Sequence, residues 1–179
     1  MKNKPETIAL GVTGSIAAYK AADLCSKLVQ RNYNVVVLMT ASARKLITTQ
    51  TFLTLSRNPV ISDLWETGEW QPGHIELAAR ASLLLVAPCT ANFIGKYANG
   101  VADDALSTYA LSHRGKVLLA PAMNPAMWMH PAVRNNVRIL KERGVEFIGP
   151  AEGRVACGEA EGPGRMTDVD SILEAVCGK

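Results

Sequence analysis

Short apolar runs that alternate with helical segments are the feature that most limits how this chain can fold. Aliphatic residues dominate four runs: Thr7–Val12, Asn34–Met39, Ser82–Ala87 and Lys116–Ala120. Strands that are apolar throughout are buried on both faces, and helices between them imply parallel crossover connections. The sequence therefore predicts an α/β fold, a three-layer doubly wound parallel sheet of the Rossmann or flavodoxin-like type.

Weaker patterns complete this prediction. A fifth strand is expected at Val145–Ile148 and a weak one at Pro59–Ile61, giving five or six strands in all. Helices are expected at Ile16–Arg31, Ala43–Ser56, His74–Arg80, Ala91–Asn99, Asp103–Leu111, Pro131–Arg143 and Asp168–Val176. The sequence has no internal repeat and no convincing linker, so we expect a single domain over residues 1–179.

Composition and charge exclude several classes of function. Hydrophobic residues make up 48% of the chain and charged residues 20%, which is typical of a globular protein. The net charge of +3 is small and spread out, so nucleic-acid binding is not expected. The longest apolar run, residues 81–87, is too short to span a membrane, and no signal-peptide segment precedes the first strand. We therefore expect a cytoplasmic protein without a nucleic-acid or membrane partner.

The four cysteines, Cys25, Cys89, Cys157 and Cys177, are widely spaced and form no Cys/His cluster. Neither a zinc site nor another metal site is expected, and a disulfide framework is unnecessary at this length. The ordinary interpretation of each cysteine is a small buried hydrophobe. Only Cys157 has a context that favours another role.

Ligands of doubly wound sheets bind beyond the carboxyl ends of the strands, so the segments after the strands are the place to look for function. After the first strand, Gly14 permits a tight turn and Ser15 can cap a helix whose N-terminus suits a phosphate. This segment is neither GxGxxG nor a P-loop, and an ordinary helix entry explains it equally well. After the second strand, Thr40 and Ser42 can complete a phosphate cradle or cap the next helix.

The third and fourth strand exits are more distinctive. After the third strand, Thr90 and Asn92 suit a polar ligand, or they cap a helix. After the fourth, residues 120–131 contain three methionines, one tryptophan and three prolines. A core segment rarely uses so much proline, so a pocket wall for a flat ring is the better interpretation, with Asn124 as its polar contact.

The fifth strand is followed by a long loop, residues 149–166, with five glycines and two prolines. This composition excludes a helix and a regular strand pair, and favours a lid or binding loop. Cys157 lies at its centre, where Arg154 and Arg165 favour a thiolate, although a surface loop with an accidental cysteine is the alternative. His113 and His130 are interpreted as loop residues without a function.

Together these segments resemble the homo-oligomeric flavin-containing cysteine decarboxylases, over about Thr7–Val176. The resemblance is carried by Gly14–Lys20, His74-Ile75, Pro88–Phe93, Pro121–Trp128, Ala156–Glu159 and Gly164–Met166. Pro121–Trp128 is a full match to the family's PxMNxxMW motif, and the last two stretches look like its substrate-recognition clamp. Pro88–Phe93 looks like the family's PASANT motif, with Cys89, Thr90 and Phe93 in place of Ala, Ser and Thr.

The resemblance implies FMN as the cofactor and assigns residues to it. The phosphate and ribityl side would contact Gly14, Ser15, Ile16, Thr40 and Ser42. The flavin would be lined by Thr90, Ala91, Asn92 and Ala122. The family forms homotrimers with FMN at the subunit interface, sometimes assembled into dodecamers.

The resemblance also implies a small-molecule substrate, 4′-phosphopantothenoylcysteine, which is decarboxylated to 4′-phosphopantetheine in coenzyme A biosynthesis. Oxidation of the substrate's CH2–SH carbon gives a thioaldehyde, and carbon dioxide then leaves to form an enethiol. His74 would be the general base, Asn124 would hold the carboxylate and Cys157 would donate a proton. Substrate binding would involve Asn124, Met127, Ala156 and Gly158.

Two alternatives stay open at this stage. A peptidyl-cysteine decarboxylase would share the flavin and PxMNxxMW motifs, but we expect it to lack the clamp at Ala156–Gly158. A regulatory FMN-binding protein would bind the cofactor without turnover. The joint presence of His74, Asn124 and Cys157 favours an enzyme, a carboxy-lyase.

Overall fold

The computed structural model describes residues 5–64, 73–153 and 162–178. Its main sheet has five parallel strands in the order β2-β1-β3-β4-β5. Their bounds are Thr7–Val12 (β1), Asn34–Met39 (β2), Ala81–Cys89 (β3), Lys116–Pro121 (β4) and Glu146–Phe147 (β5). The chain builds outward from β1 to β2 and then returns to place β3 on the other side of β1. This reversal is the switch point of a doubly wound sheet, so the predicted fold class is confirmed.

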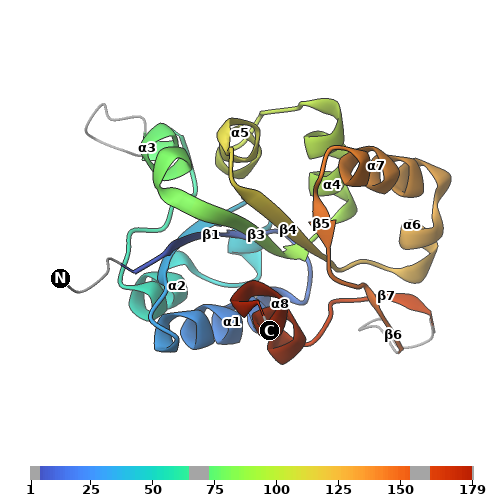
Figure 1. The fold of residues 1–179 in the computed structure, drawn as a ribbon. Coiled ribbons are helices and arrows are strands. Elements are labelled where there is room, and N and C mark those ends of the chain that lie inside the picture. Colours follow the sequence, from blue (N-terminus) through green and yellow to red (C-terminus); the bar gives the residue numbers. More distant parts are fainter. Residues whose placement is uncertain (1–4, 65–72, 154–161, 179) are drawn as a thin grey trace.

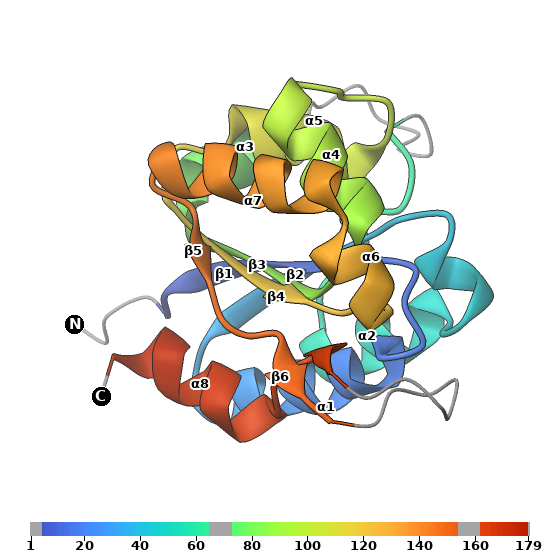
Figure 2. The ribbon, with the colours of Figure 1, turned by 90° about the vertical axis from the view of Figure 1, so that its right-hand side faces the viewer.

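Helices cover both faces of the sheet (Figures 1 and 2). One face carries α1 (Ala18–Gln30), α2 (Thr49–Ser56) and α8 (Val169–Cys177). The other face carries α3 (Gly73–Arg80), α4 (Ala91–Asn99), α5 (Ala105–Ser112) and α7 (Pro131–Glu142). No helix in the described part of the chain is long and apolar enough to cross a bilayer.

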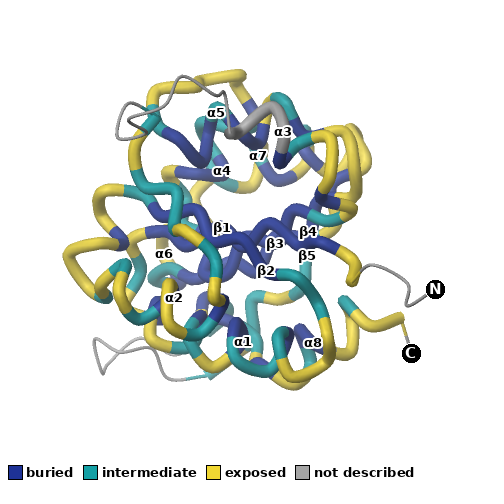
Figure 3. The backbone as a smooth tube through the Cα atoms, turned by 90° about the vertical axis from the view of Figure 1, so that its left-hand side faces the viewer, coloured by how far each residue is buried: buried dark blue, intermediate teal, exposed yellow. Residues whose placement is uncertain are grey.

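The sheet separates two hydrophobic cores, which appear as the dark central strands and the inner faces of the helices in Figure 3. Alternate residues of β1 enter different cores: Ile8 and Leu10 pack toward α1 and α8, whereas Ala9 packs on the opposite side. Both strand faces are therefore buried, and this explains why the strands read as continuous apolar runs. Gly11 also brings α5 close to β1, because a Cβ there would lie 2.8 Å from Leu106 Cδ1.

Two predicted elements on the α2 side of the sheet are wrong in detail. The expected helix Ala43–Ser56 is split into a 3-10 turn, η1 (Ala43–Lys45), and α2, because Thr48 between them has an extended backbone. The expected strand Pro59–Ile61 is reduced to one bridge between Ile61 and Leu38. A proline lacks the N–H that a longer ladder would need.

Two segments expected to be irregular are partly regular. A short helix, α6 (Pro125–Met129), forms within residues 120–131, because Asn124 caps it and Pro125 suits the first helical position. The prediction that residues 149–166 contain no strand pair is also wrong. The ends of this loop pair antiparallel as β6 (Ala151–Glu152) and β7 (Pro163–Arg165). Strands of two and three residues at an edge tolerate the glycines and the proline that would interrupt a longer sheet.

Candidate functional site

The carboxyl ends of the strands surround a cleft of about 520 Å³. This volume lies in the range of pockets that bind small molecules and cofactors. Nine residues predicted from the sequence line this one cleft: Gly14, Ser15, Thr40, Ser42, Thr90, Ala91, Asn92, Ala122 and Met127. They come from segments up to 113 positions apart (127 minus 14), and only the sheet topology brings them together.

At the β1 exit, Gly14 lies directly against Ser42 at the β2 exit. A Cβ on Gly14 would be 2.4 Å from Ser42 Cβ and 3.2 Å from the Ser42 carbonyl carbon, so only glycine permits this approach. The predicted helix cap at Ser15 is wrong: the N-cap of α1 is Ala17, without a side-chain cap. Ser15 Oγ instead accepts a hydrogen bond from Ala17 N at 3.3 Å. Ile16 is 63% exposed and is not among the residues that line the cleft.

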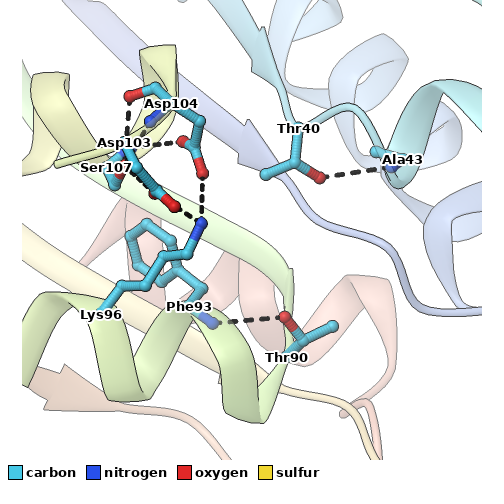
Figure 4. A network of polar contacts seen from close by, with 8 residues as sticks. All are labelled: Thr40, Ala43, Thr90, Phe93, Lys96, Asp103, Asp104 and Ser107. Atoms are coloured by element: carbon cyan, nitrogen blue, oxygen red, sulfur yellow. Dashed lines mark hydrogen bonds and ion pairs between the residues drawn. The ribbon is translucent and has the colours of Figure 1, made fainter. Parts of the chain in front are cut away.

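Thr40 and Thr90 lie at the edge of the cleft and also make local hydrogen bonds. Both line the cleft, and each hydroxyl also accepts a hydrogen bond from the helical turn that follows it (Figure 4). Thr40 Oγ1 accepts from Ala43 N at 3.2 Å, and Thr90 Oγ1 accepts from Phe93 N at 3.4 Å. Thr90 is thus the N-cap of α4, whereas Thr40 holds the turn before η1, and these hydrogen bonds fix where both hydroxyls lie.

Phe93, which replaces a threonine of the PASANT motif, has a structural role. Its side chain is 1% exposed and stacks with Tyr97, with ring centroids 5.9 Å apart. An aromatic ring at this position therefore packs α4 against the core and gives the α4 wall of the cleft an apolar backing.

A charged cluster that the sequence analysis missed lies on the same wall. Lys96 Nζ lies 2.6 Å from Asp103 Oδ1 and 2.9 Å from Asp104 Oδ2 (Figure 4). Asp104 also forms a capping box with Ser107 at the start of α5. Burial opposes the charge of Lys96, but the hydrogen bonds that Lys96 donates to Asp103 and Asp104 outweigh it and raise the Lys96 pKa.

Asn124 is positioned by α6. Its Oδ1 accepts a hydrogen bond from Ala126 N at 2.8 Å, which orients the amide at the helix N-terminus. Asn124 is not among the residues lining the cleft, although Met123 and Met127 on either side of it are. Behind it lies β7: Met123 N donates to Gly164 O at 2.9 Å, and a Cβ on Gly164 would be 2.4 Å from Met123 O.

Several predicted site residues cannot be placed in this geometry. Cys157, Ala156 and Gly158 lie outside the described residues. His74 belongs to α3 by its backbone, and its side chain is likewise outside the described part. The described residues of α3 do not line the cleft, since this helix runs directly into the amino-terminal end of β3 (Figure 1).

Other residues that line the cleft were not predicted as site residues: Thr13, Ala41, Phe93, Lys96, Asp104 and Met123. Thr13 is the most informative of these because its hydroxyl directly follows the first strand. Its place after a strand was enough to predict a site residue, since Thr40 and Thr90 were predicted because they follow the next two strands.

The remaining histidines and cysteines have structural contacts. His113 lies in the loop after α5, as predicted, and is buried there, with ring nitrogens 3.1 Å from Tyr109 Oη and from Lys116 O. Burial lowers the pKa of His113, and its bond to the Lys116 carbonyl opposes this only in part. His130 caps α7. Cys25 and Cys89 are buried as predicted, whereas the prediction for Cys177 is wrong because it is exposed.

Sequence comparison connects this geometry to a family of known proteins. The Flavoprotein family model matches residues 1–179. The coenzyme A biosynthesis bifunctional protein CoaBC of Bacillus subtilis (strain 168) is 46% identical over 170 residues, covering 93% of this chain and 41% of that protein. CoaBC of Borreliella burgdorferi is 38% identical over 174 residues, covering 97% of this chain and 44% of that protein. The chain thus spans less than half the length of these relatives.

Solved structures of decarboxylases have a similar fold over nearly the whole chain. A PPC decarboxylase mutant complexed with pantothenoylaminoethenethiol has a TM-score of 0.85 and 28% identity, covering 97% of both chains. The FMN-dependent cysteine decarboxylase SpaF has a TM-score of 0.82 and 30% identity, covering 96% of this chain and 95% of that one. Because the family model matches from the first residue to the last and the fold agrees, this chain belongs to the Flavoprotein family.

Proposed function

We propose that residues 1–179 form a flavoprotein decarboxylase domain that converts 4′-phosphopantothenoylcysteine to 4′-phosphopantetheine with FMN, in coenzyme A biosynthesis. The observation that carries this proposal is the convergence of nine predicted residues on one cleft at the carboxyl ends of the strands. The CoaBC relatives and the PPC decarboxylase structure support the substrate assignment. The cytoplasmic location stays a prediction.

The residues of the cleft fit FMN. The tight approach of Gly14 to Ser42 forms a cradle of backbone and hydroxyl groups that suits a phosphate, and a Cβ on Gly14 would fill it. Thr90, Ala91 and Asn92 offer a wall of small residues for the ring, two of them polar. When bound, FMN would supply the oxidation of the substrate's CH2–SH carbon to a thioaldehyde, whose loss of carbon dioxide leaves an enethiol, and in its reduced form it would return the two electrons to this enethiol, so that the net reaction is redox-neutral.

Asn124 is proposed to hold the substrate carboxylate through its NH2 group. The Oδ1 atom of this amide is the cap of α6, so the helix orients the side chain and the nitrogen is the end that suits an anionic ligand. Met127 lines the cleft one turn further along α6 and is proposed to contact the substrate.

Cys157 is proposed as the proton donor, on a clamp formed by residues 149–166 with Ala156 and Gly158 contacting substrate. The described ends of this segment support the proposal, since Gly153 N donates to Gly162 O at 3.3 Å and β7 is bonded to Met123. Cys157 lies four positions after Gly153, and a chain of that length reaches at most about 14 Å. The thiol is therefore tethered to the strand pair behind Asn124.

His74 is proposed as the general base, acting on the cleft of a second copy of the chain. The nine residues of β3 rise about 26 Å toward the cleft, whereas the eight residues of α3 can climb back only about 10 Å. A histidine near the start of α3 thus falls short of its own cleft. Exposed apolar side chains beside the cleft, Ile16 at 63% and Met127 at 48%, are consistent with an interface there. We propose a homotrimer, or a dodecamer assembled from such trimers.

The test is turnover of 4′-phosphopantothenoylcysteine by the purified protein, with carbon dioxide and 4′-phosphopantetheine followed by mass spectrometry. The wild type should form both. The Cys157→Ser variant should stop at a decarboxylated intermediate that lacks two hydrogens relative to the product. A yellow protein that leaves this substrate unchanged would favour a peptidyl-cysteine decarboxylase or a regulatory FMN-binding protein. Failure to take up FMN would refute the proposal.

A further inference from the structure

The hydroxyl of Thr13 joins two strand exits that are far apart in sequence. Thr13 is 1% exposed and directly follows β1. Its Oγ1 donates to the Pro88 carbonyl at 2.7 Å and accepts from Thr90 N at 3.1 Å. One side chain therefore holds the β1 exit against the β3 exit, at the switch point of the sheet.

The other strand exits around the cleft are joined by backbone hydrogen bonds. Thr40 N donates to Val12 O at 3.1 Å, which joins the β2 and β1 exits. Ala122 N donates to Cys89 O at 2.9 Å, which joins the β4 and β3 exits. Between these two links, the connection from β1 to β3 at this edge passes through the side chain of Thr13.

Thr13 also lies between the two halves of the proposed FMN site. Gly14 and Ser15, on its carboxyl side, belong to the phosphate cradle. Thr90 begins the wall proposed for the flavin ring, and its backbone N–H donates a hydrogen bond to Thr13 Oγ1. We propose that Thr13 is a positioning residue that sets the spacing between the phosphate end and the ring end of the FMN site. This inference rests on the proposed function and adds a residue to it.

Removal of the hydroxyl should disturb that spacing specifically. Thr13→Val keeps the shape of the side chain but leaves the Pro88 carbonyl and the Thr90 N–H without their partner. Because buried unpaired groups are costly, the two exits should move apart, and FMN should bind about ten- to a hundredfold more weakly. Thr13→Ser retains the hydroxyl and should stay within about threefold of the wild type.

The decisive readout compares FMN with riboflavin, which lacks the phosphate. Dissociation constants are measured by flavin fluorescence for the wild type and each variant. The wild type should prefer FMN because one ligand then engages both ends of the cleft. This preference should collapse in Thr13→Val and return in Thr13→Ser. A merely structural role would lower the melting temperature and leave the preference for FMN over riboflavin unchanged.

A matched control lies at the other end of the same strand. Thr7 is also buried, and its Oγ1 accepts a hydrogen bond from Asn34 Nδ2 at 3.1 Å. Thr7→Val should therefore lower stability without changing the preference for FMN over riboflavin. If Thr13→Val cannot be purified folded, Thr13→Ala is measured in the same way and decides the question.

An unchanged preference in Thr13→Val would overturn the inference while leaving the proposed function intact. If the wild type bound neither flavin, the proposed function and the inference would both be overturned. The two failures are therefore distinguishable in one set of titrations.

Discussion

Lys96 and Asp104 form an ion pair across the gap between α4 and α5, with Lys96 Nζ 2.9 Å from Asp104 Oδ2. The other oxygen of the same carboxylate, Oδ1, accepts the backbone N–H of Ser107 at 2.8 Å. Asp104 therefore joins the α4 wall of the cleft to the first turn of α5. Burial opposes ionisation of Asp104, but the hydrogen bonds from Lys96 and Ser107 outweigh it and hold its pKa below the ordinary value.

The depressed pKa of Asp104 predicts how stability depends on pH. A carboxyl whose folded-state pKa is lowered stabilises the protein above its unfolded pKa of about 3.9, and this contribution is lost as pH falls through the folded-state pKa. Asp104→Asn should therefore lower the free energy of unfolding by about 1 kcal/mol at neutral pH. The difference from the wild type should shrink below about pH 4.

Urea unfolding of both proteins across this pH range checks the prediction. Glu174→Gln, at an exposed position on α8, is the control, and its free energy of unfolding should follow that of the wild type across the pH range. A difference between Asp104→Asn and the wild type that stayed constant down to acid pH would contradict the ion-pair explanation.

Gly14→Ala should impair cofactor binding for steric reasons. The added methyl would lie 2.4 Å from Ser42 Cβ, so the β1 and β2 exits must separate. We expect the affinity for FMN to fall about tenfold or more, as overpacking by one methyl costs about 1–3 kcal/mol. A second change, Ser42→Gly, removes the nearest clashing atom and should restore part of the affinity. Gly95→Ala is the control, because a Cβ there meets its nearest neighbour at an ordinary 3.6 Å.

Asn124→Asp should separate catalysis from folding. The carboxylate can still accept the Ala126 N–H and cap α6, so thermal stability and FMN affinity should stay close to the wild type. The change removes the NH2 donor and places a negative charge where a substrate carboxylate is proposed to bind. We expect kcat to fall about a hundredfold or more. Steady-state kinetics would measure this fall in kcat. Asn135→Asp, at an exposed position on α7, is the control and should keep the kcat of the wild type. Undiminished turnover in Asn124→Asp would remove the amide from the proposed mechanism.

The three cysteines that the structure describes should differ strongly in reactivity. Burial raises the pKa of Cys25 to about 12 and also raises that of Cys89, whereas Cys177 is exposed. At pH 8 a thiol with a pKa near 12 is ionised in only about one molecule in ten thousand. Brief alkylation followed by peptide mass spectrometry should therefore label Cys177 and spare the two buried thiols. Urea should make all three react alike, and early labelling of Cys25 or Cys89 in the native protein would contradict this burial.

Local apolar patterns were sufficient to predict the strands that are buried on both faces. The bounds predicted for the first two strands, Thr7–Val12 and Asn34–Met39, are those observed, because burial of both faces leaves an uninterrupted apolar signal. Helix and strand ends were less accurate where a local backbone feature intervened. The extended Thr48 and the Asn124–Pro125 helix start are two such features, and apolar periodicity does not record them.

The sequence by itself determined the fold class, the family and most residues of the cleft, since these follow from apolar periodicity and from motifs at the strand exits. Only the tertiary structure decided which exits touch. The bridge from Thr13 to Pro88 and Thr90, the packing of Gly14 on Ser42 and the ion pair of Lys96 all join different strand exits or helices. Such contacts depend on strand order and on close packing around the switch point, and a local pattern carries no information about either.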